Sequence, residues 1–248
     1  MSKNASGYFE KMRVQGAGGV ARDVGWLLIP AVCLVAVMVA FGYLVTDVLP
    51  STAIGKWDAE VPRRLVEYRQ QEGISGSKFI TTLSATPTII ALTALAAAVF
   101  RWTFGRWRES LVVIYSVVGE TAIFMATTFF IHRPRPSVPH LDEAPPTSSF
   151  PSGHTAAATC FYGAVAAIIV WHSRHRWIKV VVVLVCAAIP VLIAGSRVYR
   201  GMHFPTDVLA GALLGAIWLS VVILYVHSHD AGGRRDPAVG ADTGLVSG

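Results

Sequence analysis

Six long runs of apolar residues divide the chain, and they constrain its fold more than any other feature. The runs are 25–45, 79–100, 111–131, 155–171, 178–194 and 208–226. Each approaches or exceeds the roughly 20 residues that a helix needs to cross a bilayer. Only 15% of the residues are charged, whereas soluble chains carry about 25%. The sequence therefore predicts an all-α integral membrane protein with six transmembrane helices in one bundle.

Polar segments flank this bundle at both ends. Residues 1–23 are polar and basic, and residues 227–248 are polar and rich in glycine. We expect a cytoplasmic N-terminal segment (1–23), one six-helix membrane domain (24–226) and a flexible cytoplasmic tail (227–248). Between the first two apolar runs, residues 57–68 predict a short helix lying at the membrane interface.

The distribution of basic residues predicts the orientation of the bundle. Six spans put both termini on one side, and that side carries 12 of the 21 Lys and Arg residues, six of them in short loops. Positive charge in short loops marks the cytoplasmic face. The chain is thus expected to be a multi-pass cell-membrane protein whose loops 50–78, 132–153 and 195–206 face outward. The net charge of +6 is spread between apolar runs, so no nucleic acid partner is expected.

Two of the outward loops collect cationic side chains, against this bias. They and the helix starts beside them contain His132, Arg133, Arg135, His140, His154, Arg197, Arg200 and His203. Because such groups bind anions, and arginine suits phosphate in particular, the pattern predicts a phosphoryl ligand at the outer face.

The helix starts in these loops have residues suited to phosphoryl chemistry. Ser152 is a candidate N-cap, so the N–H groups of Gly153 and His154 form an intrinsic anion site. His203 and Asp207 are four residues apart, which places them on one helical face. The carboxylate is then expected to hold one ring nitrogen while the other attacks a phosphorus atom.

Three motifs, taken together in order and spacing, resemble the type 2 phosphatidic acid phosphatase (PAP2) superfamily. They are Arg135-Pro136, then Pro151-Ser152-Gly153-His154, then Ser196-Arg197 followed by His203 and Asp207. This superfamily includes bacterial lipid phosphate phosphatases. The resemblance covers roughly residues 80–226.

The resemblance implies a role for each matching residue. His203 would be the nucleophile that forms a phosphohistidine, Asp207 its orienting partner, and His154 the general acid and then the base. The phosphoryl oxygens would be bound by Arg135, Arg197, Ser152 and the backbone of Gly153. The scheme requires neither a metal nor another cofactor.

Two residues depart from this simple scheme. The first motif usually begins with a lysine, which would fall at position 128, but this chain has Thr128. We expect Arg133 or His132 to replace the missing cation, and Arg133 is taken as a further phosphate ligand. Glu120 lies within the third span, about 22 Å below Arg135 by helical rise. It is expected to make a structural hydrogen bond inside the bundle.

These features together predict a metal-independent phosphatase that hydrolyses a lipid phosphate monoester or diphosphate. Its expected partners are the bilayer and a lipid phosphate at the outer leaflet: a polyprenyl diphosphate, phosphatidylglycerol phosphate or phosphatidic acid. A phosphotransferase that moves the phosphoryl group to a lipid or sugar acceptor would share every motif and is the alternative enzyme. An anion transporter usually shows repeated halves with midplane polar residues, and no repeat is evident here.

Overall fold

A computed structural model of the chain describes residues 25–144 and 146–232, with side chains described as far as residue 227. Within these ranges the backbone forms helices and the loops that connect them. The expected N-terminal segment (1–23) lies outside the described residues. The last helix continues to Gly232, so the expected tail begins later than residue 227, and its remainder (233–248) is also outside the described part.

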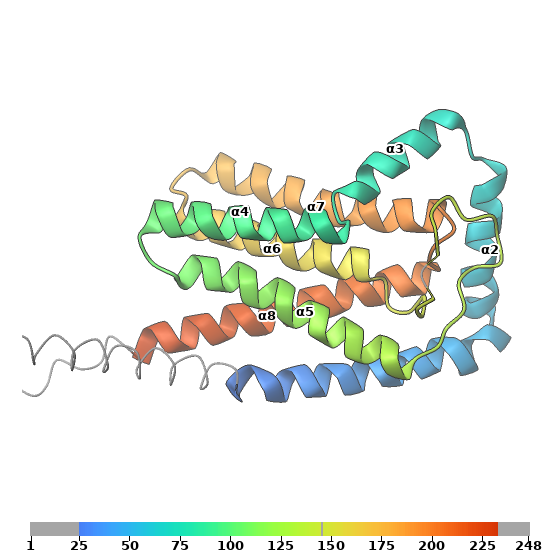
Figure 1. Cartoon of the computed structure of the whole chain (residues 1–248), viewed down its shortest axis with the longest axis horizontal. Coiled ribbons are helices and arrows are strands. Elements are labelled where there is room, and N and C mark those ends of the chain that lie inside the picture. Colours follow the sequence, from blue (N-terminus) through green and yellow to red (C-terminus); the bar gives the residue numbers. More distant parts are fainter. Residues whose placement is uncertain (1–24, 145, 233–248) are drawn as a thin grey trace, which may run out of the picture.

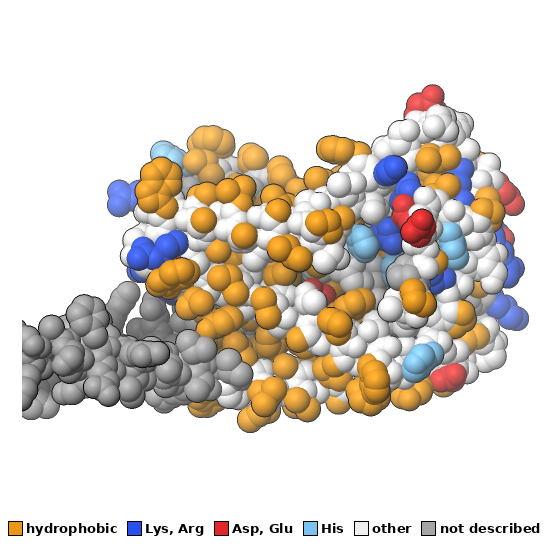
Figure 2. Space-filling view, in the orientation of Figure 1, with side chains coloured by type: hydrophobic (Ala, Val, Ile, Leu, Met, Phe, Trp, Pro, Cys, Tyr) orange, Lys and Arg blue, Asp and Glu red, His pale blue; other side chains and the backbone are white. Residues whose placement is uncertain are grey.

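Six helices are long and apolar enough to cross a membrane, which confirms the prediction from hydropathy. They are Gly25–Ser51, α4 (Thr86–Phe104), α5 (Arg108–Phe130), α6 (Gly153–His172), α7 (Arg176–Tyr199) and α8 (Pro205–Gly232). They run side by side along the long axis of the molecule (Figure 1). A helix satisfies its own backbone hydrogen bonds, which a lipid environment demands. The apolar side chains cover the middle of the bundle, and charged side chains gather near its ends (Figure 2).

Two further helices, α2 (Ala53–Glu67) and α3 (Gln71–Thr82), lie between the first two spans. α2 crosses one end of the bundle (Figure 1), and the Thr52 hydroxyl caps it by accepting from the Gly55 N–H at 3.3 Å. The predicted helix at 57–68 is thus confirmed. The predicted span 79–100 is partly wrong, since its first residues belong to α3 and the span begins at Thr86. Pro87 lies in the first turn of α4, a position that proline favours because the N–H it lacks has no partner within the helix there.

Close packing of α8 on α6 brings the starts of these two helices together. A Cβ atom on Gly211 would lie 2.4 Å from the Ser152 carbonyl oxygen, and one on Gly215 would lie 2.6 Å from the Ala156 carbonyl oxygen. Only glycine permits such an approach, as small residues do at many membrane helix contacts. The Ser152 N–H also donates to the Asp207 carbonyl oxygen at 3.0 Å. The second and third sequence motifs therefore meet at one end of the bundle.

Candidate active site

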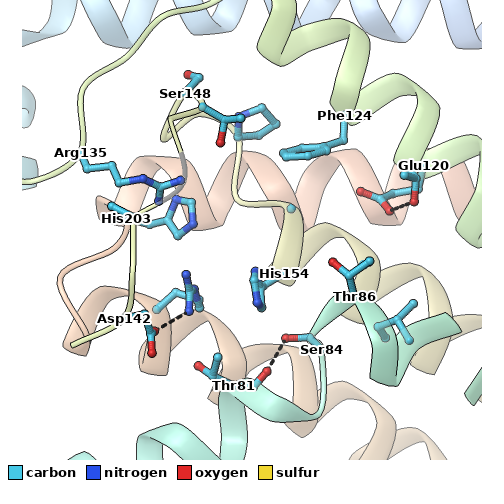
Figure 3. A pocket seen from close by; sticks show the side chains of 18 of the residues that line it. Thr81, Ser84, Thr86, Glu120, Phe124, Arg135, Asp142, Ser148, His154 and His203 are labelled. Atoms are coloured by element: carbon cyan, nitrogen blue, oxygen red, sulfur yellow. Dashed lines mark hydrogen bonds and ion pairs between the residues drawn. The ribbon is translucent and has the colours of Figure 1, made fainter. Parts of the chain in front are cut away.

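A cavity of about 830 Å³ brings together five of the predicted site residues. These are Arg135, Gly153, His154, Arg197 and His203. They come from the α5–α6 loop, the start of α6, the end of α7 and the α7–α8 connection, and Figure 3 shows the side chains of Arg135, His154 and His203 around a common space. The predicted residues Ser152, Asp207 and Arg133 lie outside the cavity lining.

The start of α6 forms one wall of the cavity. Ser152 occupies the N-cap position, but its hydroxyl makes no capping bond and lies 3.1 Å from the Thr155 hydroxyl instead. The first N–H groups of a helix lack partners within the helix and attract anions. A Cβ atom on Gly153 would lie 2.9 Å from the Phe124 ring, so this glycine is required for packing against α5. Ser152 is fully buried and contributes through backbone position, since its side chain does not reach the cavity.

Two guanidinium groups supply the positive charge of the cavity. Arg135 donates to the Met202 carbonyl oxygen at 2.8 Å and Arg197 donates to Asp142 at 2.9 Å. The Nε atoms of both arginines are buried and have no hydrogen-bond partner among the described residues. Burial also lowers the pKa of Arg135, although the charge of Asp207 opposes this effect. Because buried donors are nearly always paired in proteins, two unpaired N–H groups beside one cavity indicate a site for an anion.

The His203 ring is held in one orientation by a backbone carbonyl. Its Nδ1 atom lies 2.7 Å from the Ser149 carbonyl oxygen. A carbonyl oxygen can only accept, so Nδ1 carries the hydrogen and Nε2 keeps its lone pair. Burial lowers the pKa of His203, and the nearby Asp207 carboxylate only partly offsets that effect. A neutral imidazole with a lone pair on Nε2 has the form that a nucleophile needs.

The expected bond between Asp207 and His203 is not formed. The Asp207 carboxylate lies 3.7 Å from His203 Nδ1, which is beyond hydrogen-bond distance. It instead accepts from the Phe204 N–H at 2.9 Å and from Arg133 at 2.5 Å. The spacing predicted that the two side chains share one helical face, but α8 begins at Pro205, so His203 lies in the connection before that helix. The sequence also gave no sign of the Ser149 carbonyl that binds His203.

Arg133 lies in a buried ion-pair network behind the cavity. Its guanidinium contacts Asp58 of α2 at 2.7 Å, Asp207 at 2.5 Å and the Thr206 hydroxyl at 2.7 Å. Asp58 in turn accepts from the Thr206 N–H at 2.8 Å, so it caps the first turn of α8 from a distant helix. The structure thus places Arg133 away from the position expected of a phosphate ligand. Two carboxylates hold it there because they are buried and need a counter-charge.

The other candidate replacements for the motif lysine also lie away from the cavity. Neither Thr128 nor His132 is among the lining residues, and the Thr128 hydroxyl donates to the Met125 carbonyl oxygen at 2.9 Å. In the described part of the chain, the arginines that line the cavity are Arg135 and Arg197.

Three acidic residues that sequence reasoning did not place there line the cavity: Glu120, Asp142 and Glu143. Asp142 binds Arg197 and also Arg200, at 2.6 Å. Burial raises the pKa of Asp142, but its hydrogen bonds and ion pairs with the two arginines outweigh this and hold the pKa below its usual range. Glu120 of α5 lines the inner end of the same cavity, although the expected distance of about 22 Å along the helix had put it well below the site. That distance followed the helix up to Arg135, but the loop after α5 folds back over the cavity.

Arginine and histidine side chains that line a cavity at one end of a bundle of membrane-length helices suit a membrane protein that acts on phosphoryl groups. The chain belongs to the PAP2 superfamily, which matches residues 82–230. The phosphatidylglycerophosphatase B of Bacillus subtilis (strain 168) is 30% identical over 190 residues, covering 73% of this chain and 89% of the relative. The undecaprenyl-diphosphatase of Sulfolobus acidocaldarius is 30% identical over 172 residues, covering 66% of this chain and 76% of the relative.

A solved structure shares the architecture. The crystal structure of the transmembrane PAP2 type phosphatidylglycerolphosphate phosphatase from Bacillus subtilis superposes with a TM-score of 0.69 and 26% sequence identity. The match covers 82% of this chain and 98% of that chain. The resemblance seen in the three motifs is therefore confirmed, and the relatives named here are phosphatases or diphosphatases.

Proposed function

We propose that the chain hydrolyses a lipid phosphate monoester or diphosphate at the extracytoplasmic face, through a phosphohistidine intermediate. The observation that carries this proposal is the convergence of the Arg135 and Arg197 side chains, a helix N-terminus and the His203 ring on one cavity. An anion, a nucleophile and a proton donor can meet there without a metal ion.

The reaction follows from the roles of these groups. His203 Nε2 attacks the phosphorus atom, the bond to the lipid oxygen breaks, and His154 gives its proton to that oxygen. The Ser149 carbonyl stabilises the positive charge on the imidazole through Nδ1–H. His154 then takes a proton from water, the hydroxide attacks phosphorus, and the phosphorus–nitrogen bond breaks to release phosphate. Arg135, Arg197 and the start of α6 stabilise the charge on the phosphoryl oxygens throughout.

A lipid substrate is supported by the shape of the cavity. Its inner end is bounded by residues of α4 and α5, among them Ile90 and Thr121. Both side chains are exposed on the outer surface of the bundle, Ile90 by 62%. A phosphorylated headgroup can therefore occupy the polar end while its chain leaves between α4 and α5 into the bilayer.

Purified protein in detergent is expected to release phosphate from at least one of polyprenyl diphosphate, phosphatidylglycerol phosphate and phosphatidic acid. Activity should persist in EDTA, because guanidinium and N–H groups provide the charge that a metal would otherwise supply. Vanadate should inhibit, since it adopts the trigonal bipyramidal geometry of the transferring phosphoryl group. Phosphate release is measured for each lipid, and complete loss in EDTA that magnesium restores would contradict the proposed mechanism.

The orientation of the bundle gives a separate prediction. Reporters placed after Gly248 and at Arg106 should be cytoplasmic, and a reporter at Ala144 should be external, because the basic short loops face inward. Enzymatic reporters that are active on only one side of the membrane provide the measurement. A cytoplasmic signal from Ala144 would put the cavity on the other face.

A further inference from the structure

Glu120 has no place in the catalytic scheme, yet its side chain lies at the inner end of the cavity (Figure 3). It is 1% exposed. Its neighbours in the lining include the apolar side chains of Ile89, Ile90 and Val117. An ionisable group in such a setting within a membrane protein is expensive to bury and usually has a function.

The Glu120 carboxyl group lacks a good partner within the protein. In the described part of the chain its one hydrogen bond comes from the Thr121 hydroxyl at 3.5 Å. That hydroxyl also lies 2.8 Å from the Val117 carbonyl oxygen. A hydroxyl has a single hydrogen, and the shorter contact takes it. The carboxyl group is therefore buried, directed at a cavity and essentially unpaired.

The position of Glu120 along α5 places it on the lipid side of the phosphoryl site. Phe124 contacts the start of α6 at Gly153, where the anion is expected. Glu120 lies one turn earlier, about 6 Å nearer the middle of the bundle, and helical side chains lean toward the N-terminus of their helix. The part of a lipid just beyond its phosphate would occupy this region.

We propose that Glu120 is a specificity-determining residue that binds the oxygen-bearing backbone of a glycerol-type lipid phosphate. The inference rests on the proposed phosphatase function and selects among its substrates. The glycerol of lysophosphatidate and the headgroup glycerol of phosphatidylglycerol phosphate each offer a free hydroxyl, which can pair with a carboxyl group as donor or acceptor. A polyprenyl monophosphate is hydrocarbon at the same place, so it would displace water and leave the carboxyl group buried without a partner. A site built to hydrogen-bond a substrate discriminates strongly against an analogue that lacks the group.

The test compares lysophosphatidate, which has a free hydroxyl, with farnesyl phosphate, which has none. Values of kcat/KM are measured for the wild type, Glu120→Gln and Glu120→Leu in one detergent. Glu120→Leu should lower kcat/KM for lysophosphatidate about tenfold or more and leave that for farnesyl phosphate unchanged or higher. Glu120→Gln should retain most of the preference, because an amide still pairs with a hydroxyl.

Ser116→Ala serves as the matched control. Ser116 is buried one turn before Glu120 on α5 and is outside the cavity lining, so its substitution should change neither value. If Glu120 has a purely structural role, its substitution would lower kcat/KM equally for both substrates and would also lower the melting temperature. That result overturns the inference while the phosphatase function stands. A wild type that releases phosphate from neither lipid would also overturn the inference. The proposed function is overturned only if polyprenyl diphosphate, phosphatidylglycerol phosphate and phosphatidic acid release no phosphate either.

A second measurement uses only the wild type and so does not depend on a variant that folds. Two non-hydrolysable alkyl phosphonates of equal length, with and without a glycerol-type hydroxyl, are compared as inhibitors of phosphate release. The hydroxylated compound should inhibit at about tenfold lower concentration. Equal inhibition by the two compounds would overturn the proposed role of Glu120.

Discussion

A His203→Ala variant is expected to release no phosphate from any lipid and to form no phosphoenzyme. The His203 imidazole is the proposed nucleophile. Its Nδ1 atom lies 2.7 Å from the Ser149 carbonyl oxygen, and this hydrogen bond orients the lone pair on Nε2. Alanine offers no nucleophile, so turnover should fall by at least about a thousandfold. The measurement is phosphate release together with labelling by a substrate that carries radioactive phosphorus.

His154→Ala is the informative comparison for that variant. The proposed general acid matters least when the leaving group has a low pKa, so an aryl phosphate should still phosphorylate His203 in this background. Water would then lack its base, and the labelled protein should accumulate. Both proteins should melt at temperatures close to the wild type. Labelling that persists without His203 would show that another residue is the nucleophile.

Hydropathy predicted the six spans because the bilayer sets a minimum length that apolar runs must meet. Motif spacing also predicted which loops form the site, since Arg135, His154, Arg197 and His203 reach one cavity. These successes rest on periodicity and on order along the chain. Periodicity and residue order can be read directly from the sequence, and neither depends on how distant segments pack.

The errors arise where packing between distant segments of the chain determines the surroundings of a residue. Asp58 lies on a helix that the sequence placed at the membrane interface, and its bonds to Arg133 and Thr206 join residues far apart in the chain. No local sequence pattern indicates that Asp58 pairs with residues so distant in the chain. Glu120 was misplaced because helical rise gives a distance along one helix only. It says nothing about a loop that returns over the cavity.

The Ser149 carbonyl shows a further limit. Backbone atoms are the same at every residue, so a sequence cannot indicate which carbonyl will face His203. Asp207 was assigned that role because a carboxylate four residues away is visible as a side chain. In the structure its carboxylate serves the network with Arg133 and the first turn of α8, and it affects His203 mainly through its charge.

Arg133→Ala is expected to lower the stability of the protein. The loss of a phosphate ligand would instead lower activity without lowering stability. Removal of this guanidinium leaves Asp58 and Asp207, both almost fully buried, without their counter-charge. Breaking a buried ion pair on one side costs about 3–5 kcal/mol of stability. The melting temperature in detergent should therefore fall clearly, and activity should be lost in parallel with folded protein.

The matched variants are Asp58→Asn and Thr128→Lys, each combined with Arg133→Ala. Asp58→Asn removes one of the two uncompensated charges and keeps an acceptor for the Thr206 N–H, so the double variant should recover part of the melting temperature. Thr128→Lys adds a cation outside the cavity lining and should recover nothing. If Arg133 bound phosphate instead, its loss would lower kcat/KM at an unchanged melting temperature, and the lysine would restore activity. The measurements distinguish the two roles of Arg133. A structural role changes the free energy of unfolding, whereas a phosphate-binding role changes the stabilisation of the transition state.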